Sequence, residues 1–327
     1  MDHIGVGKSE AVKSNIMNKP LIINKKKRRI KQFIPLFIMM APGLIYFLIN
    51  NYLPMLGMII AFKKVNFAVG ILESEWVGFD NFKYLFSTSD AWVITRNTIG
   101  YNLVFIVLTI VISISIAILL NEIKHKFFTR FYQSVILLPH LISFVIISYL
   151  AYAVLSIDTG LMNNTVLPKF GAEGISWYME PKYWPYILTS INLWKGIGFN
   201  TLIFFAAVIG INDEYYEAAR LDGASKWQQM MKITLPLITP VIILLTLLSI
   251  GRIFYADFGL FYQVPMNSGS LYETTNVIDT YVFRGLIGLG DISMSTAAGV
   301  YQSCVGFILV LVANLIVRRI SKDDALF

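Results

Sequence analysis

Residues 217–225 read Glu-Ala-Ala-Arg-Leu-Asp-Gly-Ala-Ser, and residues 233–236 read Ile-Thr-Leu-Pro. They form a charged, polar stretch between two long apolar runs at 184–211 and 235–255. Polar groups without partners are costly in a hydrocarbon layer, so such a stretch belongs outside it. We therefore expect residues 217–236 to lie at a membrane surface.

The stretch carries the signals of a short helix followed by a sharp turn. Asn212 or Asp213 can cap the helix, and Glu214 and Glu217 lie near its positive N-terminal end. Gly223 stands where a C-terminal cap or turn favours a residue that tolerates positive φ. The sequence therefore predicts a helix that ends at this glycine.

A second helix is expected to follow and to complete a helix–turn–helix. It carries one aromatic and several apolar side chains before Pro236 opens the next apolar segment: Trp227, Met230, Met231 and Ile233. On the first helix, Ala218 and Ala219 leave small side chains, so another surface can approach the backbone closely. From the physical pattern alone, a solvated loop between two helices stays an alternative.

The composition is that of a polytopic membrane protein. Of 327 residues, 56% are hydrophobic and 14% are charged, and the mean hydropathy is +0.63. The one cysteine, Cys304, excludes an intramolecular disulfide framework and a cysteine-cluster metal site. The net charge of +7 is also compatible with nucleic acid, but the basic residues gather at the ends of apolar runs. This distribution favours a membrane topology signal over nucleic-acid binding.

Six apolar runs reach the length of about 20 residues that a membrane helix needs. We expect an all-α bundle with spans near 33–62, 97–121, 132–157, 184–211, 235–256 and 293–317. Pro139 and Pro240 are expected to loosen backbone pairing inside the third and fifth spans, with bundle neighbours satisfying the freed groups.

Six spans place both termini on one side of the membrane. Most basic residues lie in the N-terminal tail, near 124–130, in the loop 212–234 and after residue 317. The positive-inside rule therefore predicts that both termini and the loop 212–234 are cytoplasmic. The opposite loops hold fewer basic residues: Lys63, Lys64, Lys83, Arg96, Lys169, Lys182 and Arg284.

These patterns divide the chain into three parts. Residues 1–32 form a basic N-terminal tail, 33–318 the membrane domain with its loop 212–234, and 319–327 a C-terminal tail. The basic run 25–29 precedes the first apolar run and favours anionic lipid as its partner.

The spacing Glu-Ala-Ala, three residues, Gly, nine residues and Ile-x-Leu-Pro resembles the coupling-loop signature of binding-protein-dependent ABC importer permeases. Shorter pieces are similar to the carbohydrate branch of that family. The resemblance covers residues 33–327 and is closest to permeases for oligosaccharides or polysaccharide fragments. The pieces that carry it are Trp76–Phe82, Asn97-Thr98, Leu138-Pro139-His140, Gly160–Asn163 and Val277–Tyr281.

The resemblance implies a type I importer permease in a bacterial-type cytoplasmic membrane. It implies a second, similar permease, two cytosolic ATPase subunits that carry ATP and Mg²⁺, and an extracellular solute-binding protein. No cofactor is expected in this chain. The loop 257–292 is expected to face the binding protein. Residues implied to couple this chain to an ATPase are Glu217, Ala218, Ala219, Asp222, Gly223, Leu235 and Pro236.

Polar side chains within or near the fourth and fifth spans suggest a substrate path. Ionisable groups inside membrane helices usually face a cavity or a partner, and sugars need aromatic faces and hydrogen-bonding groups. The candidates are Asn192, Lys195, Asn200, Arg252 and Tyr255. The alternative is structural: Lys195 and Arg252 snorkel or pair, with Asp257 closing a local pair. If the cations line the path, an acidic oligosaccharide such as a uronate is favoured.

No catalytic constellation stands out in the sequence, so we expect a transport subunit rather than an enzyme. Two alternatives stay open: import of another small solute, such as an amino acid or a peptide, and a polytopic membrane enzyme or channel that needs no ATPase.

Overall fold

The computed structural model describes residues 25–320, with side chains from Phe33 to Arg319. The tails expected at 1–32 and 319–327 therefore lie largely outside the described residues. The chain divides into two compact units, one ending at Gly57 and one beginning at Met58. Within the first unit, the described elements are α1 (Lys25–Phe47), η1 (Leu48–Tyr52) and α2 (Leu53–Met55).

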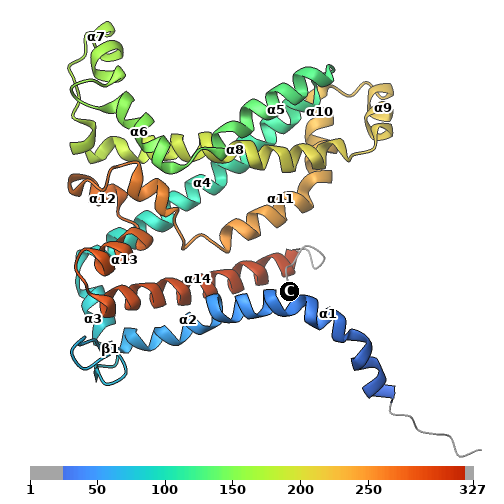
Figure 1. Ribbon diagram of the computed structural model, residues 1–327. Helices are drawn as coiled ribbons and strands as arrows, with labels where there is room; N and C mark the ends of the chain where they lie inside the picture. The colour runs from blue at the N-terminus through green and yellow to red at the C-terminus, as the bar shows by residue number, and fades with distance from the viewer. Residues whose placement is uncertain (1–24, 321–327) are drawn as a thin grey trace, which may run out of the picture. The chain divides into compact units, whose positions relative to one another are not determined.

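The second unit is helical apart from one short strand pair (Figure 1). Its long helices are α4 (Ser89–Asn121), α8 (Trp184–Ile209), α11 (Leu235–Ile250) and α14 (Ile292–Ile320), and a bent pair is formed by α5 (Lys126–Leu141) and α6 (Phe144–Leu155). The shorter elements are η2 (Leu56–Phe62), β1 (Lys63–Lys64), β2 (Glu75–Trp76), α3 (Asp80–Ser87), η3 (Met162–Val166), α7 (Leu167–Lys169), η4 (Trp177–Met179), η5 (Pro181–Tyr183), α9 (Asp213–Leu221), α10 (Lys226–Gln229), η6 (Met230–Thr234), η7 (Gly259–Gln263), η8 (Gly269–Leu271), α12 (Tyr272–Thr275) and α13 (Ile278–Ile287).

Five helices of the described chain are long and apolar enough to cross a membrane, and the bent pair makes a sixth if it counts as one span. The five are Phe33–Phe62, Ser89–Asn121, Pro181–Ile209, Lys226–Ile250 and Ile292–Arg319. This agrees with the predicted all-α membrane fold. The largest differences from the predicted boundaries are in two spans: the second begins at Ser89 rather than 97, and the fifth runs from Lys226 to Ile250 rather than from 235 to 256.

The third span is not the single helix predicted over 132–157. Helices α5 and α6 meet at 94° across Ile142 and Ser143. Ser143 starts the second helix, because its side chain accepts the Ile146 N–H and its backbone is extended. The break therefore follows Pro139 by three residues, where a capping serine gives the chain a new helix start.

Four prolines of the second and first units follow a π-turn by two residues. The π-turns are η1, η3, η6 and η7, and the prolines are Pro54, Pro168, Pro236 and Pro265. A proline has no N–H and its ring clashes with the carbonyl four residues earlier, and a widened turn relieves both constraints. At Pro236 the widened turn lets the helix continue through the proline. Residues 226–250 therefore form one continuous span, and the second helix of the helix–turn–helix does not end before Pro236.

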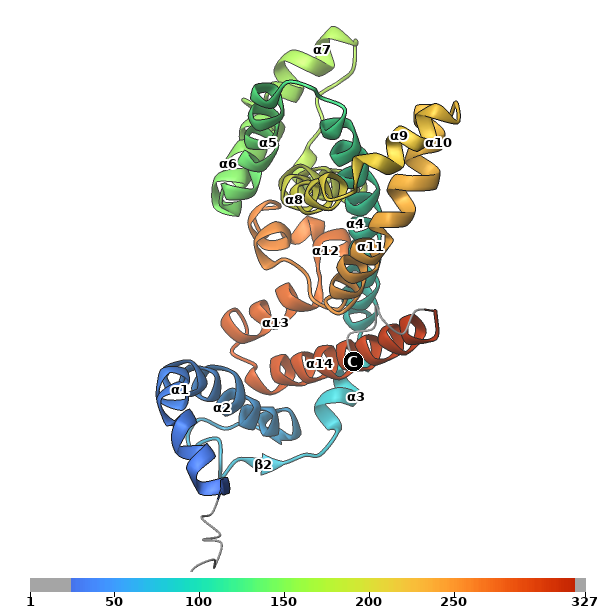
Figure 2. The same ribbon diagram turned by 90° about the vertical axis from the view of Figure 1, so that its right-hand side faces the viewer.

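Helix α8 lies between the bent pair and the helices α4 and α11 (Figure 2). Its close approach to α5 depends on Gly198, where a Cβ atom would lie 2.1 Å from the Ile136 carbonyl oxygen. Trp184 and Leu188 at its start are fully buried in an apolar cluster with Leu260 and Phe261. These contacts make α8 the central element of the second unit.

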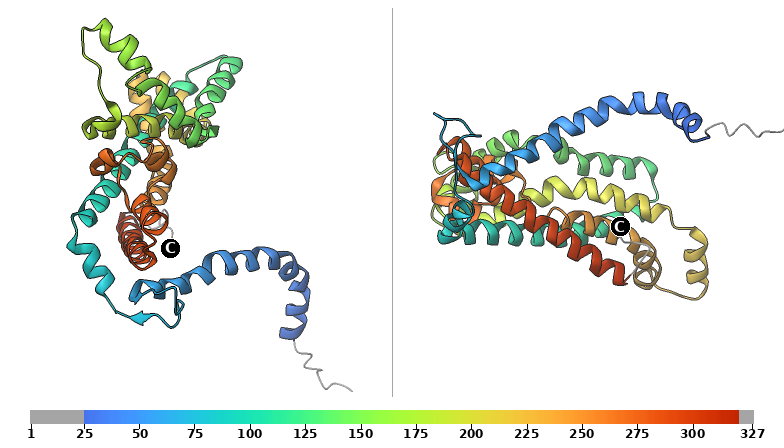
Figure 3. Two further views of the ribbon diagram at one scale, coloured as in Figure 1. Left: turned by 60° about the vertical axis from the view of Figure 1, so that its left-hand side comes forward. Right: turned by 90° about the horizontal axis from the view of Figure 1, so that it is seen from below.

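The two ends of the second unit differ in structure. Helices α9 and α10 lie at one end of the long helices, and α7, α12 and α13 lie at the other (Figures 1 and 3). The end with α12 and α13 also holds the strand pair, in which Lys63 pairs with Trp76. The polar stretch 212–234 and the segments that hold α7, α12 and α13 are therefore at opposite ends of the bundle.

Candidate functional site

The first helix of the polar stretch, α9, is closed at both ends by local hydrogen bonds. Asn212 is its N-cap, with the side-chain oxygen 3.1 Å from the Glu214 nitrogen. At the other end, Gly223 has a φ of +76°. The Ala224 N–H donates to the Ala219 carbonyl over 2.8 Å, the wide hydrogen bond of a Schellman motif. Both local predictions, a cap at 212 or 213 and a glycine turn at 223, are confirmed.

The second helix begins with a capping box. The Ser225 N–H donates to the Gln228 side chain over 2.8 Å, and the Gln228 N–H donates to Ser225 Oγ over 3.3 Å. Gln229 is buried, and its amide donates to the Ala224 carbonyl over 2.9 Å. The turn is therefore held from both sides and joins two helices as one rigid piece.

Two side-chain contacts fasten this helix–turn–helix to the bundle. Lys226 Nζ lies 2.8 Å from the Glu122 carboxylate at the end of α4. The Tyr216 and Thr234 hydroxyls lie 2.9 Å apart, which joins α9 to η6. Because η6 continues into α11, this contact joins α9 to a membrane span.

The outer surface of the helix–turn–helix is more apolar than a solvated loop needs to be. Leu221 is 90% exposed, Trp227 is 66% exposed and Tyr215 is 57% exposed. Exposed apolar side chains grouped on a polar segment are typical of a docking surface. Of the predicted coupling residues, Glu217, Ala218, Asp222, Gly223 and Pro236 are exposed, and Ala219 and Leu235 are half-buried.

Lys195, a predicted substrate-path residue, is bonded within the chain. Its ammonium donates to the carbonyls of Pro139, His140 and Ile142, with distances of 3.5 and 2.9 Å for the first two. It also lies 4.9 Å from the centre of the Phe144 ring. An ammonium has three N–H donors, and the three carbonyls can accept one hydrogen bond from each of them. Lys195 thus caps the end of α5 at the bend.

The other predicted path residues form no common site through hydrogen bonds. Asn200 donates to the Gly196 carbonyl within α8 over 3.1 Å, and Asn192 is half-buried on the same helix. Arg252 and Tyr255 lie beyond the end of α11 and are exposed. Within the described chain, Arg252 forms no ion pair, and Asp257 accepts the Leu260 N–H instead.

A polar network that sequence reasoning did not assemble joins α4 to the α12–α13 region. Asn97 is buried and donates to the carbonyls of Glu273 and Asn276 over 3.0 and 2.9 Å. Thr98 accepts the Ile278 N–H over 3.1 Å. Asn97-Thr98 and Val277–Tyr281 had each been recognised as a short motif, and the structure shows that they contact one another.

Arg284 closes this network from α13. It donates to the side chains of Asn267, Asn276 and Thr280, and its guanidinium lies 4.0 Å from the centre of the Tyr272 ring. Burial lowers the pKa of Arg284 from its ordinary value, and the neighbouring tyrosine raises it in part. The network fixes the turn at Asn267, where φ is +48°.

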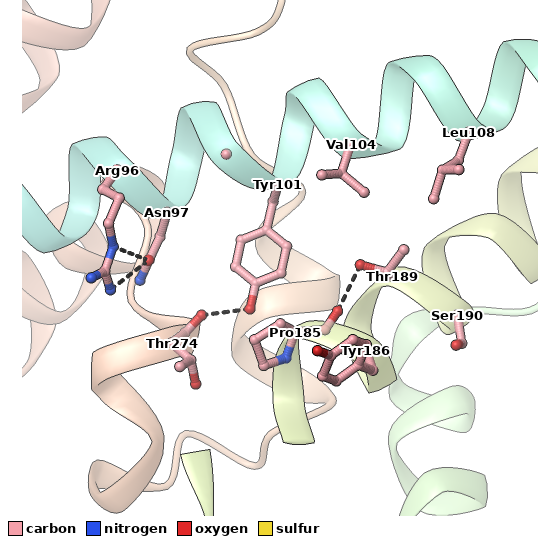
Figure 4. Close-up of a pocket in the computed structure, with 11 residues that line it drawn as sticks. Arg96, Asn97, Tyr101, Val104, Leu108, Pro185, Tyr186, Thr189, Ser190 and Thr274 are labelled. Carbon is pink, nitrogen blue, oxygen red and sulfur yellow. Dashed lines mark hydrogen bonds between the residues drawn. The ribbon is translucent and has the colours of Figure 1, made fainter. Parts of the chain in front are cut away.

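A cavity of about 660 Å³ opens beside this network, between α4, α8 and α12 (Figure 4). Arg96 and Tyr101 line it from α4, and Tyr186 and Ser190 line it from α8. Sequence reasoning used Arg96 only as a loop charge, because the second span was expected to begin at 97. Its position one residue before the Asn97-Thr98 motif was the available signal.

Comparison with known proteins gives the class of the molecule. Residues 109–322 match the family model described as "Binding-protein-dependent transport system inner membrane component". The match covers more than half of the chain, and the chain belongs to this family. It is therefore a transport permease with several candidate membrane-spanning helices.

Curated relatives and solved structures agree with that assignment. The chain is 34% identical over 308 residues to the polygalacturonan/rhamnogalacturonan transport system permease protein YteP of Bacillus subtilis (strain 168), covering 92% of this chain and 95% of the relative. It is 36% identical over 289 residues to Protein LplB of the same organism, covering 88% and 90%. A chain from the crystal structure of a bacterial ABC transporter for the acidic polysaccharide alginate matches with a TM-score of 0.83 and 33% identity, covering 91% of this chain and 99% of that one. The fold is thus that of an ABC importer permease.

Proposed function

We propose that this chain is a permease subunit of an ATP-driven importer that moves oligosaccharides or polysaccharide fragments into the cytoplasm. The observation that carries the proposal is the rigid helix–turn–helix at 213–229, continuous with a membrane span, in a chain whose relatives transport such sugars. The membrane is of the bacterial cytoplasmic type, and both termini and the loop 212–234 are cytoplasmic, as the positive-inside rule predicts.

The chain works with a second permease, two cytosolic ATPase subunits and an external binding protein. One neighbour was solved with an alginate pentasaccharide-bound periplasmic protein, which supports a binding protein as partner. ATP and Mg²⁺ reside on the ATPases. Leu221, Trp227 and Tyr215 provide the apolar contact with one ATPase, and Glu217 adds a polar contact.

Transport follows from how the docking surface is joined to the bundle. When the ATPases close on ATP, they displace α9 together with the turn at Gly223. The capping box and the Schellman motif keep the two helices from moving separately. The movement passes through η6 into α11 and favours one of two arrangements of the bundle, open outward or open inward.

An acidic oligosaccharide is the proposed substrate class. Two of the most similar proteins carry the names of acidic polysaccharides or of their import. Asn192, Asn200, Arg252 and Tyr255 stay predicted positions along the substrate path. Lys195 is expected to act there by holding the α5–α6 bend, because its ammonium is bonded to backbone carbonyls.

The test is ATP hydrolysis by the reconstituted complex with its binding protein. Oligogalacturonates, alginate oligosaccharides and neutral oligosaccharides are supplied in turn. We expect stimulation by an acidic class. Stimulation by neutral sugars alone would refute the acidic substrate but keep the importer, and stimulation by none would refute sugar import.

A further inference from the structure

The cavity between α4 and α8 presents polar groups that have no partner in the described chain. Arg96 donates through Nε and Nη2, which leaves Nη1 free. The Tyr186 hydroxyl and Ser190 Oγ form no hydrogen bond with described residues, and Tyr186 is 75% exposed. The remaining polar side chains of the wall are already bonded: Asn97, Tyr101, Thr189 and Thr274.

The guanidinium of Arg96 is held in one orientation. Asn97 Oδ1 lies 3.2 Å from Nε and 3.1 Å from Nη2, and the Glu273 carbonyl lies 3.0 Å from Nη2. Among the described residues that line the cavity there is no Asp, Glu or Lys, and Arg96 is the one charged side chain. A fixed guanidinium without a carboxylate partner is suited to bind a planar anion.

The remaining wall fits a sugar ring. Tyr101 and Tyr186 provide aromatic surface, and Val104 and Leu108 provide an apolar floor along α4 (Figure 4). The apolar face of a sugar packs on aromatic rings while its hydroxyls need hydrogen-bonding groups such as that of Ser190. The volume lies within the usual range of ligand pockets, about 300–1,000 Å³.

The site extends beyond one ring. A second cavity, of about 380 Å³, shares Tyr186 and Ser190, lies between α8 and α6, and is lined by Trp194 of α8 as well. The two cavities therefore meet at the exposed face of α8. A chain of several sugar units can follow this surface with its charged unit at Arg96.

We propose that this cavity is a subsite for an anionic sugar unit, with Arg96 binding its carboxylate and Tyr186 packing against its ring. The inference rests on the proposed function and deepens it. The subsite lies at the end of the bundle opposite to α9 and α10, one to two helical turns from Asn192 along α8. It receives the acidic substrate before the substrate reaches the middle of the membrane.

Binding of a labelled galacturonate pentasaccharide tests the proposal. The complete transporter is placed in lipid nanodiscs without its binding protein, and fluorescence anisotropy is measured against the pentasaccharide and against the same chain with its carboxylates reduced to alcohols. Arg96→Gln should lower the affinity for the acidic sugar by about 10-fold, which corresponds to the loss of one hydrogen bond to a charged group. The affinity for the reduced sugar should stay unchanged. Arg96→Lys should restore part of the loss.

Two further variants separate the site from general effects. Tyr186→Leu should lower the affinity for both sugars. Because this substitution removes an exposed side chain that forms no hydrogen bond with described residues, the fold should be kept. Lys169→Gln removes an exposed positive charge of α7 outside the cavity and should change the affinity for neither sugar.

Any of the following results would overturn the subsite. They are an Arg96→Gln complex that binds the acidic sugar like the wild type, an equal loss of both sugars in that variant, and displacement of the sugar by phosphatidylglycerol, which would make the cavity a lipid site. Absence of binding to the wild type would also refute it. If the wild-type complex with its binding protein still takes up the sugar in an ATP-dependent manner, the proposed function would nevertheless stand.

Discussion

Lys195 and Arg96 lie on neighbouring helices, α8 and α4, and the chain uses their charges in opposite ways. The ammonium of Lys195 is enclosed by carbonyls at the end of α5. The guanidinium of Arg96 is oriented by Asn97 and by the Glu273 carbonyl but keeps one nitrogen, Nη1, without a hydrogen bond to described residues, and the side chain lines a cavity. A charged residue in a membrane helix can thus have a structural role or a ligand-binding role, and the hydrogen-bond acceptors around it decide which.

The same distinction separates the two ends of the second unit. At the α12–α13 end, Asn97, Asn276 and Arg284 satisfy one another inside a buried network. At the α9–α10 end, Leu221 and Trp227 are left exposed. Bonded groups fix the shape of the bundle, and unbonded or exposed groups are those available to a ligand or a partner.

The largest expected effect comes from Lys195→Met. Lys195 bonds three carbonyls at the end of α5 in part-buried or exposed contacts, and hydrogen bonds to a charged group contribute about 1.5–3 kcal/mol each, so the complex should unfold at a clearly lower temperature. Thermal unfolding in nanodiscs measures this, with Arg252→Met as the control that removes an exposed, unpaired cation. Unchanged unfolding with a selective loss of sugar binding would place Lys195 in the substrate path and remove the contrast with Arg96.

Gly198→Ala should disturb the same bend from the helix side. Its Cβ atom would lie 2.1 Å from the Ile136 carbonyl oxygen, and overpacking of this kind costs about 2 kcal/mol. The matched control is Gly196→Ala, two residues away, where nothing lies within 4 Å of the new atom. Equal unfolding temperatures for the two variants would show that the α5–α8 contact is looser than described.

Gly223→Ala tests the turn of the helix–turn–helix. A side chain at φ +76° costs about 1 kcal/mol. We expect basal ATP hydrolysis to persist while stimulation by the loaded binding protein falls. Gly223→Asn, which accepts positive φ more readily, should keep more of the stimulation, and identical losses in the two variants would argue against a conformational cause.

Glu122→Gln should have the smallest effect. The pair with Lys226 is exposed on both sides, and such pairs contribute about 0–1 kcal/mol. The unfolding temperature should change little, and any loss of ATPase stimulation should shrink at high salt because screening weakens the pair in the wild type as well. A large loss that is independent of salt would mean that Glu122 contacts the ATPase itself.

The sequence predicted the parts of the fold that depend on composition and local pattern. Apolar length located the spans, and Asn212 and Gly223 marked the ends of α9. These signals are local, because a cap or a turn is decided by a few neighbouring residues.

Long-range contacts were beyond the sequence pattern. The apolar run 132–157 is continuous, so its hydropathy does not predict the 94° bend at Ser143. The partners of Lys195 are about 55 residues away in the chain, and those of Asn97 are nearly 180 away. Which charge is bonded and which is free therefore emerged only from the folded arrangement.

Accumulation of the galacturonate pentasaccharide inside proteoliposomes tests the central claim most directly. The complex of this chain with its partner permease and ATPases is supplied with loaded binding protein, and uptake is followed with and without ATP. The account predicts accumulation above the external concentration that requires both ATP and the binding protein and is lost in Gly223→Asp. Equilibration that is independent of ATP would contradict it and indicate a channel instead of an importer.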